Sequence, residues 1–122
     1  MTIKEIEDKG TYLWTCKDNY LNLIRPSNSE TKNTGGYKLL VDIAKTYFLS
    51  GQTEKFSEYF FESQYLVNLW TAHLIVEYGL ANTALTNKCL TIIKDYSTTP
   101  LNETLAKEET IWLHNYIKIN GD

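Results

Sequence analysis

The sequence predicts an all-α protein, because apolar residues recur at helical spacing along most of the 122 residues and no segment alternates in the manner of a strand. Hydrophobic residues make up 43% of the chain and aromatic residues 13%, enough to fill a core without disulfides or metals. Residues 63–79 (SQYLVNLWTAHLIVEYG) are apolar on two sides of a helix. Such a helix is buried between neighbours, so we expect a single domain, residues 1–122, built around it.

The N-terminal region has the pattern of one long helix or of two helices interrupted at Gly10. Thr2 and Glu5 have the spacing of a capping box. Apolar residues then recur at helical spacing, namely Ile3, Ile6, Leu13, Cys16, Tyr20, Leu21 and Ile24. The pattern ends before Pro26, and residues 25–34 (RPSNSETKNT) contain no large apolar side chain. We expect residues 25–34 to form an exposed loop.

Two helices are expected between this loop and the central segment. The first ends at Gly51, and its core face carries Leu40, Ile43, Ala44, Tyr47 and Phe48. Thr53 then caps a short helix over residues 53–63, whose core side carries Phe56, Tyr59 and Phe60. In the central helix, we expect Ser63 to be the N-cap and Gly79 to adopt the left-handed conformation after the C-terminus.

Two further helices bring the expected number to about six. One extends from about residue 81 to residue 96 and buries Leu85, Cys89, Ile92 and Ile93. In the other, Thr99 and Pro100 have the pattern of an N-cap and a first helical residue. The apolar stripe of this last helix consists of Leu101, Leu105, Ile111, Trp112, Leu113, Tyr116 and Ile117.

Residues 40–61 and 68–93 resemble degenerate copies of one helix pair, with Gly51 and Gly79 at the same junction. Antiparallel helix pairs stacked in register predict a short, HEAT-like α-solenoid. The spacing of 28 residues between the two glycines is shorter than the roughly 40 residues of a HEAT unit.

No sequence motif of an enzyme is present, since the chain lacks a phosphate-binding glycine loop, an HExxH motif, a nucleophile elbow and a calcium loop. His73 and Glu77 lie one turn apart on the central helix and could form a hydrogen-bonded pair or two metal ligands. A metal site needs at least one more ligand, which the sequence does not indicate. We therefore interpret the two residues as a structural pair partly covered by Trp70, and expect no catalytic residue, metal site or cofactor.

Cys16 and Cys89 lie at core positions of their helices, without CxxC or zinc spacing and without a cationic cluster that would lower a thiol pKa. They are buried thiols or, alternatively, a disulfide. The sequence has no N-terminal signal segment and no apolar run long enough to span a membrane. These features predict a cytoplasmic protein with reduced cysteines.

The charge balance is ordinary for a soluble domain, and it is also compatible with a basic protein partner. With 12 basic and 15 acidic residues, the net charge of −3 argues against a general nucleic-acid binder and suits a basic protein. Acidic residues recur at intervals of four along the short helix, at Glu54, Glu58 and Glu62, and repel one another there. Phe61 falls beside them, either tucked under a neighbouring helix or as the anchor of a binding footprint. The last helix is expected to extend this face with Glu103, Glu108 and Glu109.

Residues 69–112 contain LWTAHLIVEYG, then a helix of the form ALTNKCLTIIKD, then a helix carrying IWL. This segment resembles small bacterial HEAT-like domains of the DUF2019 type, a fold that is also common among immunity proteins of polymorphic toxin and contact-dependent inhibition systems. The resemblance implies a compact α-solenoid that binds another protein. An immunity protein of this kind is acidic and cytoplasmic, and it neutralises a cognate toxin, often a basic nuclease, by covering the toxin's active site.

Two alternatives to the immunity protein stay open. One is a HEAT-like adaptor in another intracellular complex, which would use the concave face of the same fold. The other is an enzyme, for example a metal-dependent hydrolase, centred on His73 and Glu77. Neither a membrane nor a nucleic acid is expected as a partner.

Overall fold

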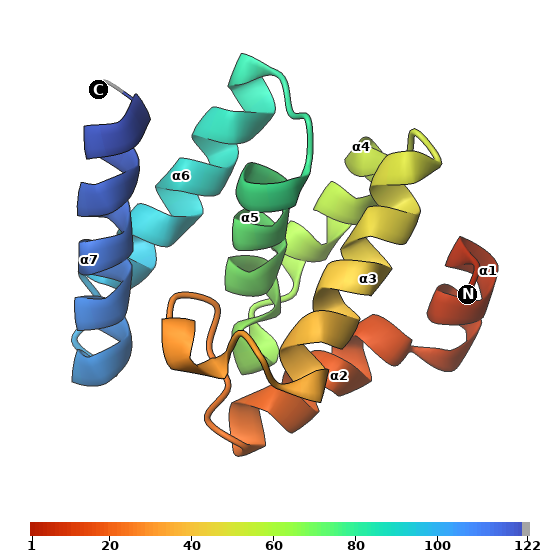
Figure 1. Cartoon of the computed structure of the whole chain (residues 1–122), viewed down its shortest axis with the longest axis horizontal. Helices are drawn as coiled ribbons and strands as arrows, with labels where there is room; N and C mark the ends of the chain where they lie inside the picture. Colours follow the sequence, from red (N-terminus) through yellow and green to blue (C-terminus); the bar gives the residue numbers. More distant parts are fainter. Residues whose placement is uncertain (121–122) are drawn as a thin grey trace.

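The computed structural model describes residues 1–120, and every regular element in that range is helical (Figure 1). The α-helices are α1 (Ile3–Lys9), α2 (Thr11–Leu21), α3 (Gly35–Leu49), α4 (Thr53–Phe56), α5 (Val67–Tyr78), α6 (Thr83–Ser97) and α7 (Glu103–Asn120). Short 3₁₀ helices lie between them: η1 (Ser29–Thr31), η2 (Ser57–Phe61) and η3 (Gln64–Leu66). The all-α prediction is confirmed, and this range contains seven α-helices where about six were expected.

The seventh helix arises at Gly10, which separates α1 from α2. Gly10 has a φ of 61°, a left-handed conformation that glycine adopts at little cost. The capping box before it is confirmed: Thr2 Oγ1 accepts a hydrogen bond from the Glu5 N–H, and the Glu5 carboxylate accepts one from the Thr2 N–H. Of the two alternatives for the N-terminal region, the interrupted pair is therefore correct.

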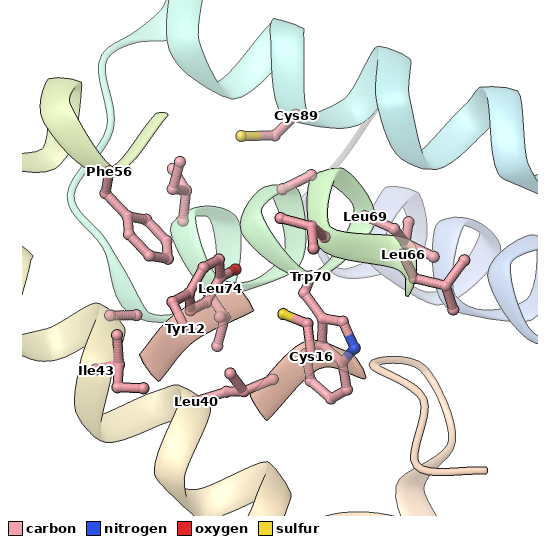
Figure 2. Close-up of a cluster of buried hydrophobic side chains, with 14 of the residues drawn as sticks. Tyr12, Cys16, Leu40, Ile43, Phe56, Leu66, Leu69, Trp70, Leu74 and Cys89 are labelled. Atoms are coloured by element: carbon pink, nitrogen blue, oxygen red, sulfur yellow. The ribbon is translucent and has the colours of Figure 1, made fainter. Parts of the chain in front are cut away.

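Helix α5 is the centre of the molecule, as predicted. Its buried residues are Val67, Leu69, Trp70, Thr71, Ala72, His73, Leu74 and Ile75. Trp70 is only 1% exposed and contacts the Tyr37 ring edge-on, with the ring centroids 5.3 Å apart. Figure 2 shows Trp70 among core side chains from several helices, including Cys16 of α2 and Leu40 of α3. A helix enclosed in this way explains why its sequence is apolar on two sides.

The N-terminal end of α5 differs from the prediction. Ser63 is not its N-cap, because the chain first forms η3, in which Tyr65 and Leu66 have positive φ values of 53° and 60°. Bulky residues adopt this conformation at a cost of about 1–2 kcal/mol each. The cost is offset because the turn buries Leu66 in the core and packs the Tyr65 ring against Tyr20, 5.6 Å away between centroids.

The C-terminal end of α5 also differs, since Gly79 has an extended backbone (φ −96°, ψ 164°) rather than a left-handed one. Its role is steric: a Cβ atom at this position would lie 2.9 Å from the Ile75 carbonyl oxygen and 3.3 Å from the Phe48 ring. Gly51, by contrast, has a φ of 70° and open space around it. Gly51 is therefore favoured by its left-handed backbone and Gly79 by the lack of space for a Cβ atom. The two glycines do not mark equivalent junctions.

The expected 28-residue repeat is not supported by the segments that follow these glycines. After Gly51, α4 has four residues and continues as the 3₁₀ helix η2, whereas after Gly79, α6 has 15 residues. A solenoid of antiparallel pairs is therefore not confirmed. Helices α5, α6 and α7 pack one against the next, and α7 lies at one edge of the molecule beside α6 (Figure 1).

Two expected helix caps are wrong. Gln52 rather than Thr53 precedes α4, and the last helix begins at Glu103 rather than at Pro100. Asn102 Oδ1 accepts a hydrogen bond from the Leu105 N–H at 3.0 Å, which satisfies a free donor in the first turn of α7. The asparagine therefore caps the helix, and the preceding Leu101 lies exposed outside it.

Candidate functional site

His73 lies in the middle of α5, and its ring connects three parts of the chain. It is 2% exposed, and its Nδ1 atom lies 2.8 Å from Glu77 Oε2 one turn along the same helix. Its Nε2 atom lies 2.5 Å from Glu109 Oε1 on α7 and 3.1 Å from Ser27 Oγ in the segment between α2 and η1. The predicted pairing of His73 with Glu77 is confirmed, but the second carboxylate was not anticipated.

The two carboxylates keep the His73 ring protonated. Burial opposes the charged form, but the hydrogen bonds to Glu109 and Glu77 and the charges of these two residues outweigh burial and raise the pKa of His73 to about 9. At neutral pH each ring nitrogen therefore carries a proton that it donates to a carboxylate. Trp112 covers the ring edge-on, with centroids 4.6 Å apart, whereas Trp70 was expected to cover it.

This arrangement does not suit catalysis, although Ser27, His73 and Glu77 contact one another in the order of a serine–histidine–acid triad. A general base must present a free lone pair to the nucleophile. Here the Nε2 lone pair is occupied by a proton that is shared with Glu109. No group of three or more His, Cys, Asp and Glu side chains in residues 1–120 has the arrangement of a metal site.

Residues 25–34 are not the exposed loop that the sequence predicts, because their first half packs against α7. Arg25 Nε and Nη2 each donate a hydrogen bond of 2.8 Å to the Glu108 carboxylate, and Pro26 is buried. Asn28 then caps η1 by accepting a hydrogen bond from the Glu30 N–H. The partner of Arg25 lies 83 residues away, a distance over which helical periodicity carries no information.

The structure separates the acidic residues that the sequence assigned to one face. Glu109 is fully buried against His73, so its interpretation as a surface acid is wrong. Glu108 is held by Arg25, which leaves Glu103 as the exposed acid among these three residues of α7. Helices α5 and α6 lie between α7 and α4 (Figure 1). The acids of α7 therefore do not extend the acidic surface of the short helix.

The segment from Glu54 to Glu62 is more irregular than the expected helix. Glu54 and Glu58 are exposed and form no ion pair with any residue in the range 1–120, but Glu62 turns back and accepts a hydrogen bond from the Gln64 N–H. The α-helix ends at Phe56 and becomes 3₁₀, so the regular ladder of carboxylates is not formed. The core side is as predicted, with Phe56 buried and Tyr59 and Phe60 packed against the core.

Phe61 resolves the alternative that the sequence left open, because its side chain is 90% exposed rather than tucked under a neighbour. A hollow of about 300 Å³ lies beside it, between η2 and α6. Glu58 and Phe60 line the hollow from η2, and Lys88 and Ile92 line it from α6. We define Glu54, Glu58, Phe61 and this hollow as the Phe61 surface.

Sequence reasoning missed a second exposed surface, on the outer side of α2. Leu13, Tyr20 and Leu21 belong to the helical apolar pattern, yet all three are exposed, as is the neighbouring Trp14. The core side of the same helix carries Tyr12 and Cys16, which point among the buried side chains in Figure 2. The signal was present, since α2 is apolar on two sides like α5. Periodicity alone does not say which helix lies at the periphery.

Comparison of the chain with known protein families, with curated proteins and with solved structures finds no match. The helices of residues 1–120 do not combine the length and apolar character that crossing a bilayer requires. The fold and the two exposed surfaces are therefore the observations on which a functional conclusion can be built.

Proposed function

We propose that this protein is a bacterial immunity protein, which acts in the cytoplasm by binding a basic, nuclease-type toxin domain and covering the active site of that domain. The Phe61 surface is the observation that carries the proposal. An aromatic ring that is 90% exposed is poorly hydrated, and Glu58 lines the same hollow. Neither the carboxylate of Glu58 nor that of Glu54 on α4 forms an ion pair among the described residues. A basic protein that buries the ring and neutralises the carboxylates would resolve both features.

The chemistry of His73 supports binding rather than catalysis. Its ring is buried and protonated between Glu77 and Glu109, so this cluster lacks the free base that an enzyme centred on it would need. The geometry accordingly favours a protein that acts through its surface. The resemblance of residues 69–112 to domains found among immunity proteins points in the same direction.

The proposal is tested by measuring association and dissociation rates with the basic domain encoded next to this protein's gene. The double variant Glu54→Lys/Glu58→Lys should slow association by about tenfold or more at low salt and reduce its salt dependence. Phe61→Ala should mainly speed dissociation, because an apolar anchor acts after the encounter. The matched control is Glu103→Lys, an exposed acid on α7, which should leave both rates unchanged.

Wild-type rates in all Phe61-surface variants would contradict the proposed footprint. Equal weakening by Glu103→Lys would show that net charge alone drives the association. Each variant should unfold within about 0.5 kcal/mol of the wild type, since exposed substitutions of this kind perturb stability little.

An adaptor in another intracellular complex is the second candidate. The exposed outer face of α2 favours it, because a protein that only covers one active site needs one binding surface. The two candidates differ in whether the product of the neighbouring gene is the partner.

A further inference from the structure

The outer face of α2 forms a continuous apolar stripe. At 100° per residue, Leu13, Trp14, Lys17, Tyr20 and Leu21 span the outer side of the helix, away from the buried residues Tyr12, Cys16 and Asn19, and the exposed Asp18 borders this side next to Trp14. Trp14 and Leu21 are 65% and 66% exposed. Monomeric proteins rarely leave several large apolar side chains together in water unless a partner covers them. We call Leu13, Trp14, Lys17, Tyr20 and Leu21 the α2 stripe.

A shaped groove accompanies the stripe. Tyr65 stands beside it, in edge contact with Tyr20 and with Lys17 Nζ located 5.6 Å from its ring centroid. A hollow of about 310 Å³ between Trp14 and Tyr65 adjoins a second hollow of about 490 Å³ next to Tyr20. Gln64 and Tyr65 line both hollows, and the second hollow extends from Tyr20 toward Tyr96 of α6 and Leu105 of α7.

The wall of this groove is fixed in place. Tyr65 and Leu66 have consecutive positive φ values, and strained backbone of this type persists only where the surroundings determine it. Leu66 is buried in the core, and this contact holds the turn in place. The Tyr65 ring is thus held before any ligand arrives, which lowers the entropic cost of binding.

The charged residues along the groove indicate which charge a partner should carry. Lys9 and Lys17 both line the hollow at Trp14, and neither forms a salt bridge within the described part of the chain. The one carboxylate there, Glu62, is turned toward the Gln64 N–H. With two ammonium groups against one carboxylate, the hollow has a net positive charge, and it is complementary to a partner that carries both apolar and acidic side chains.

The backbone restricts the form of that partner. The N–H and C=O groups of α2 are bonded within the helix, and residues 1–120 contain no strand edge to which an extended peptide could add. Recognition must therefore use side chains, as when the apolar side of one helix lies in the groove of another protein. A second copy of this chain fits poorly, because antiparallel pairing of two α2 stripes would place Lys17 opposite Lys17.

We infer that the α2 stripe is a docking surface for an amphipathic α-helix of a partner protein, with apolar residues of that helix flanking an acidic residue opposite Lys17. The hollows of the α2 stripe share no lining residue with the hollow of the Phe61 surface. The inference therefore does not depend on the proposed toxin partner.

The test uses two helix-stabilised synthetic peptides of about 15 residues, with one apolar side and either Glu or Lys at the central position. Fluorescence anisotropy should show that the Glu peptide binds the wild-type protein about tenfold or more tightly than the Lys peptide. Trp14→Ala should weaken binding of the Glu peptide by about tenfold. Lys17→Glu should remove the preference for the Glu peptide. Because both positions are exposed, both variants should keep the wild-type circular dichroism and melting temperature.

Leu49→Ala is the matched control, since it removes another exposed large apolar side chain away from the groove, and it should bind the Glu peptide like the wild type. Absence of binding up to about 1 mM peptide, or equal binding of the two peptides, would overturn the inference. A dimer of the protein alone that Trp14→Ala dissociates would assign the stripe to a second copy instead. Vesicles with anionic lipid that bind wild type but not Trp14→Ala would assign it to a membrane surface.

Discussion

His73 is buried and yet charged, a combination that depends on its two carboxylate partners. Removing a charged side chain from water costs free energy, and this cost is offset only when hydrogen bonds and opposite charges surround the charged group. Here Glu77 and Glu109 satisfy both N–H groups. The consequence is that the protonation of one ring is linked to the docking of α7 and of the segment that contains Ser27.

This linkage predicts how stability depends on pH. The pKa of His73 is raised from an ordinary value of 6.5 to about 9 by folding, so the folded state binds the proton more tightly than the unfolded state. The stabilisation is complete below the unfolded pKa of 6.5 and is lost as the pH rises through about 9. We expect wild-type unfolding free energy to fall by on the order of 3 kcal/mol across this range. Urea denaturation at several pH values measures it.

His73→Gln is the control for this pH dependence, because glutamine keeps hydrogen-bonding capacity without a titrating ring. The variant should be less stable than the wild type at low pH, and the difference between the two should shrink as the pH rises through about 9. A difference that stays constant with pH would mean that the ring is neutral in the folded protein.

Trp70 provides a prediction about the core. Trp70→Ala should lower the unfolding free energy by about 3–5 kcal/mol, because the lost ring leaves a cavity that α3 and α5 cannot close. Trp70→Phe should cost less, about 1–2 kcal/mol, since its smaller ring still fills most of the space and removes an indole N–H with no hydrogen-bond partner in residues 1–120. Chemical denaturation measures both. Equal losses for the two variants would contradict this account of the site.

At the scale of elements, Gly51 and Gly79 offer a matched pair of substitutions. Gly51→Asn should change stability by less than about 1 kcal/mol, because asparagine tolerates left-handed backbone and the site is open. Gly79→Asn should destabilise by about 1–3 kcal/mol, because its Cβ would press on the Ile75 carbonyl oxygen. Thermal unfolding of the two variants distinguishes the roles. The reverse order would show that both positions require glycine for the same conformational reason.

The contact between α7 and the segment before η1 is also testable. Arg25 and Glu108 form two parallel hydrogen bonds and are each less than a fifth exposed. A double-mutant cycle with Arg25→Ala and Glu108→Ala should give a coupling energy of about 1–3 kcal/mol. Arg25→Lys should lose much of it, because an ammonium group cannot form the paired contact. A coupling near zero would mean that the pair is merely adjacent.

Element types were easier to predict than element ends. The apolar face of α3 and the burial of α5 follow from periodicity, and both are observed. The ends of α5 depend on local geometry that periodicity does not encode: left-handed Tyr65 and Leu66 at one end and a crowded Gly79 at the other. The repeat prediction is not confirmed for a related reason: the sequence does not reveal whether a glycine is needed for a positive φ angle or for its lack of a Cβ atom.

At the scale of the whole molecule, the contacts of the site could not be predicted, because they join residues far apart in sequence. His73 and Glu77 are neighbours on one helix and were identified. Glu109 reaches the same ring from 36 residues away, and Ser27 from 46. A glutamate on an amphipathic helix is normally exposed, but Glu109 lies four residues after Leu105 and three before Trp112, within the apolar stripe of the last helix. The local pattern therefore indicated that Glu109 is buried, but it could not indicate that His73 is its partner.

The burial of each helix predicts how strongly its amides should be protected against hydrogen exchange. Helix α5 has eight buried residues, whereas α7 has two, Leu105 and Glu109, and packs mainly on α6. Amides in the second half of α7 should therefore exchange fastest among the long helices, and those in α5 slowest. Exchange followed by NMR or mass spectrometry tests this order. Equal protection in both helices would mean that the fold opens only as a whole.

The two buried cysteines have a practical consequence for labelling. Burial raises the pKa of both thiols, to about 12 for Cys89, so neither forms a reactive thiolate at neutral pH. A cysteine introduced at an exposed position such as Leu49 would therefore react with a maleimide dye while Cys16 and Cys89 do not. Dyes for distance measurements can be attached without first replacing the native cysteines. Any slow reaction of Cys16 or Cys89 would report how often the core opens.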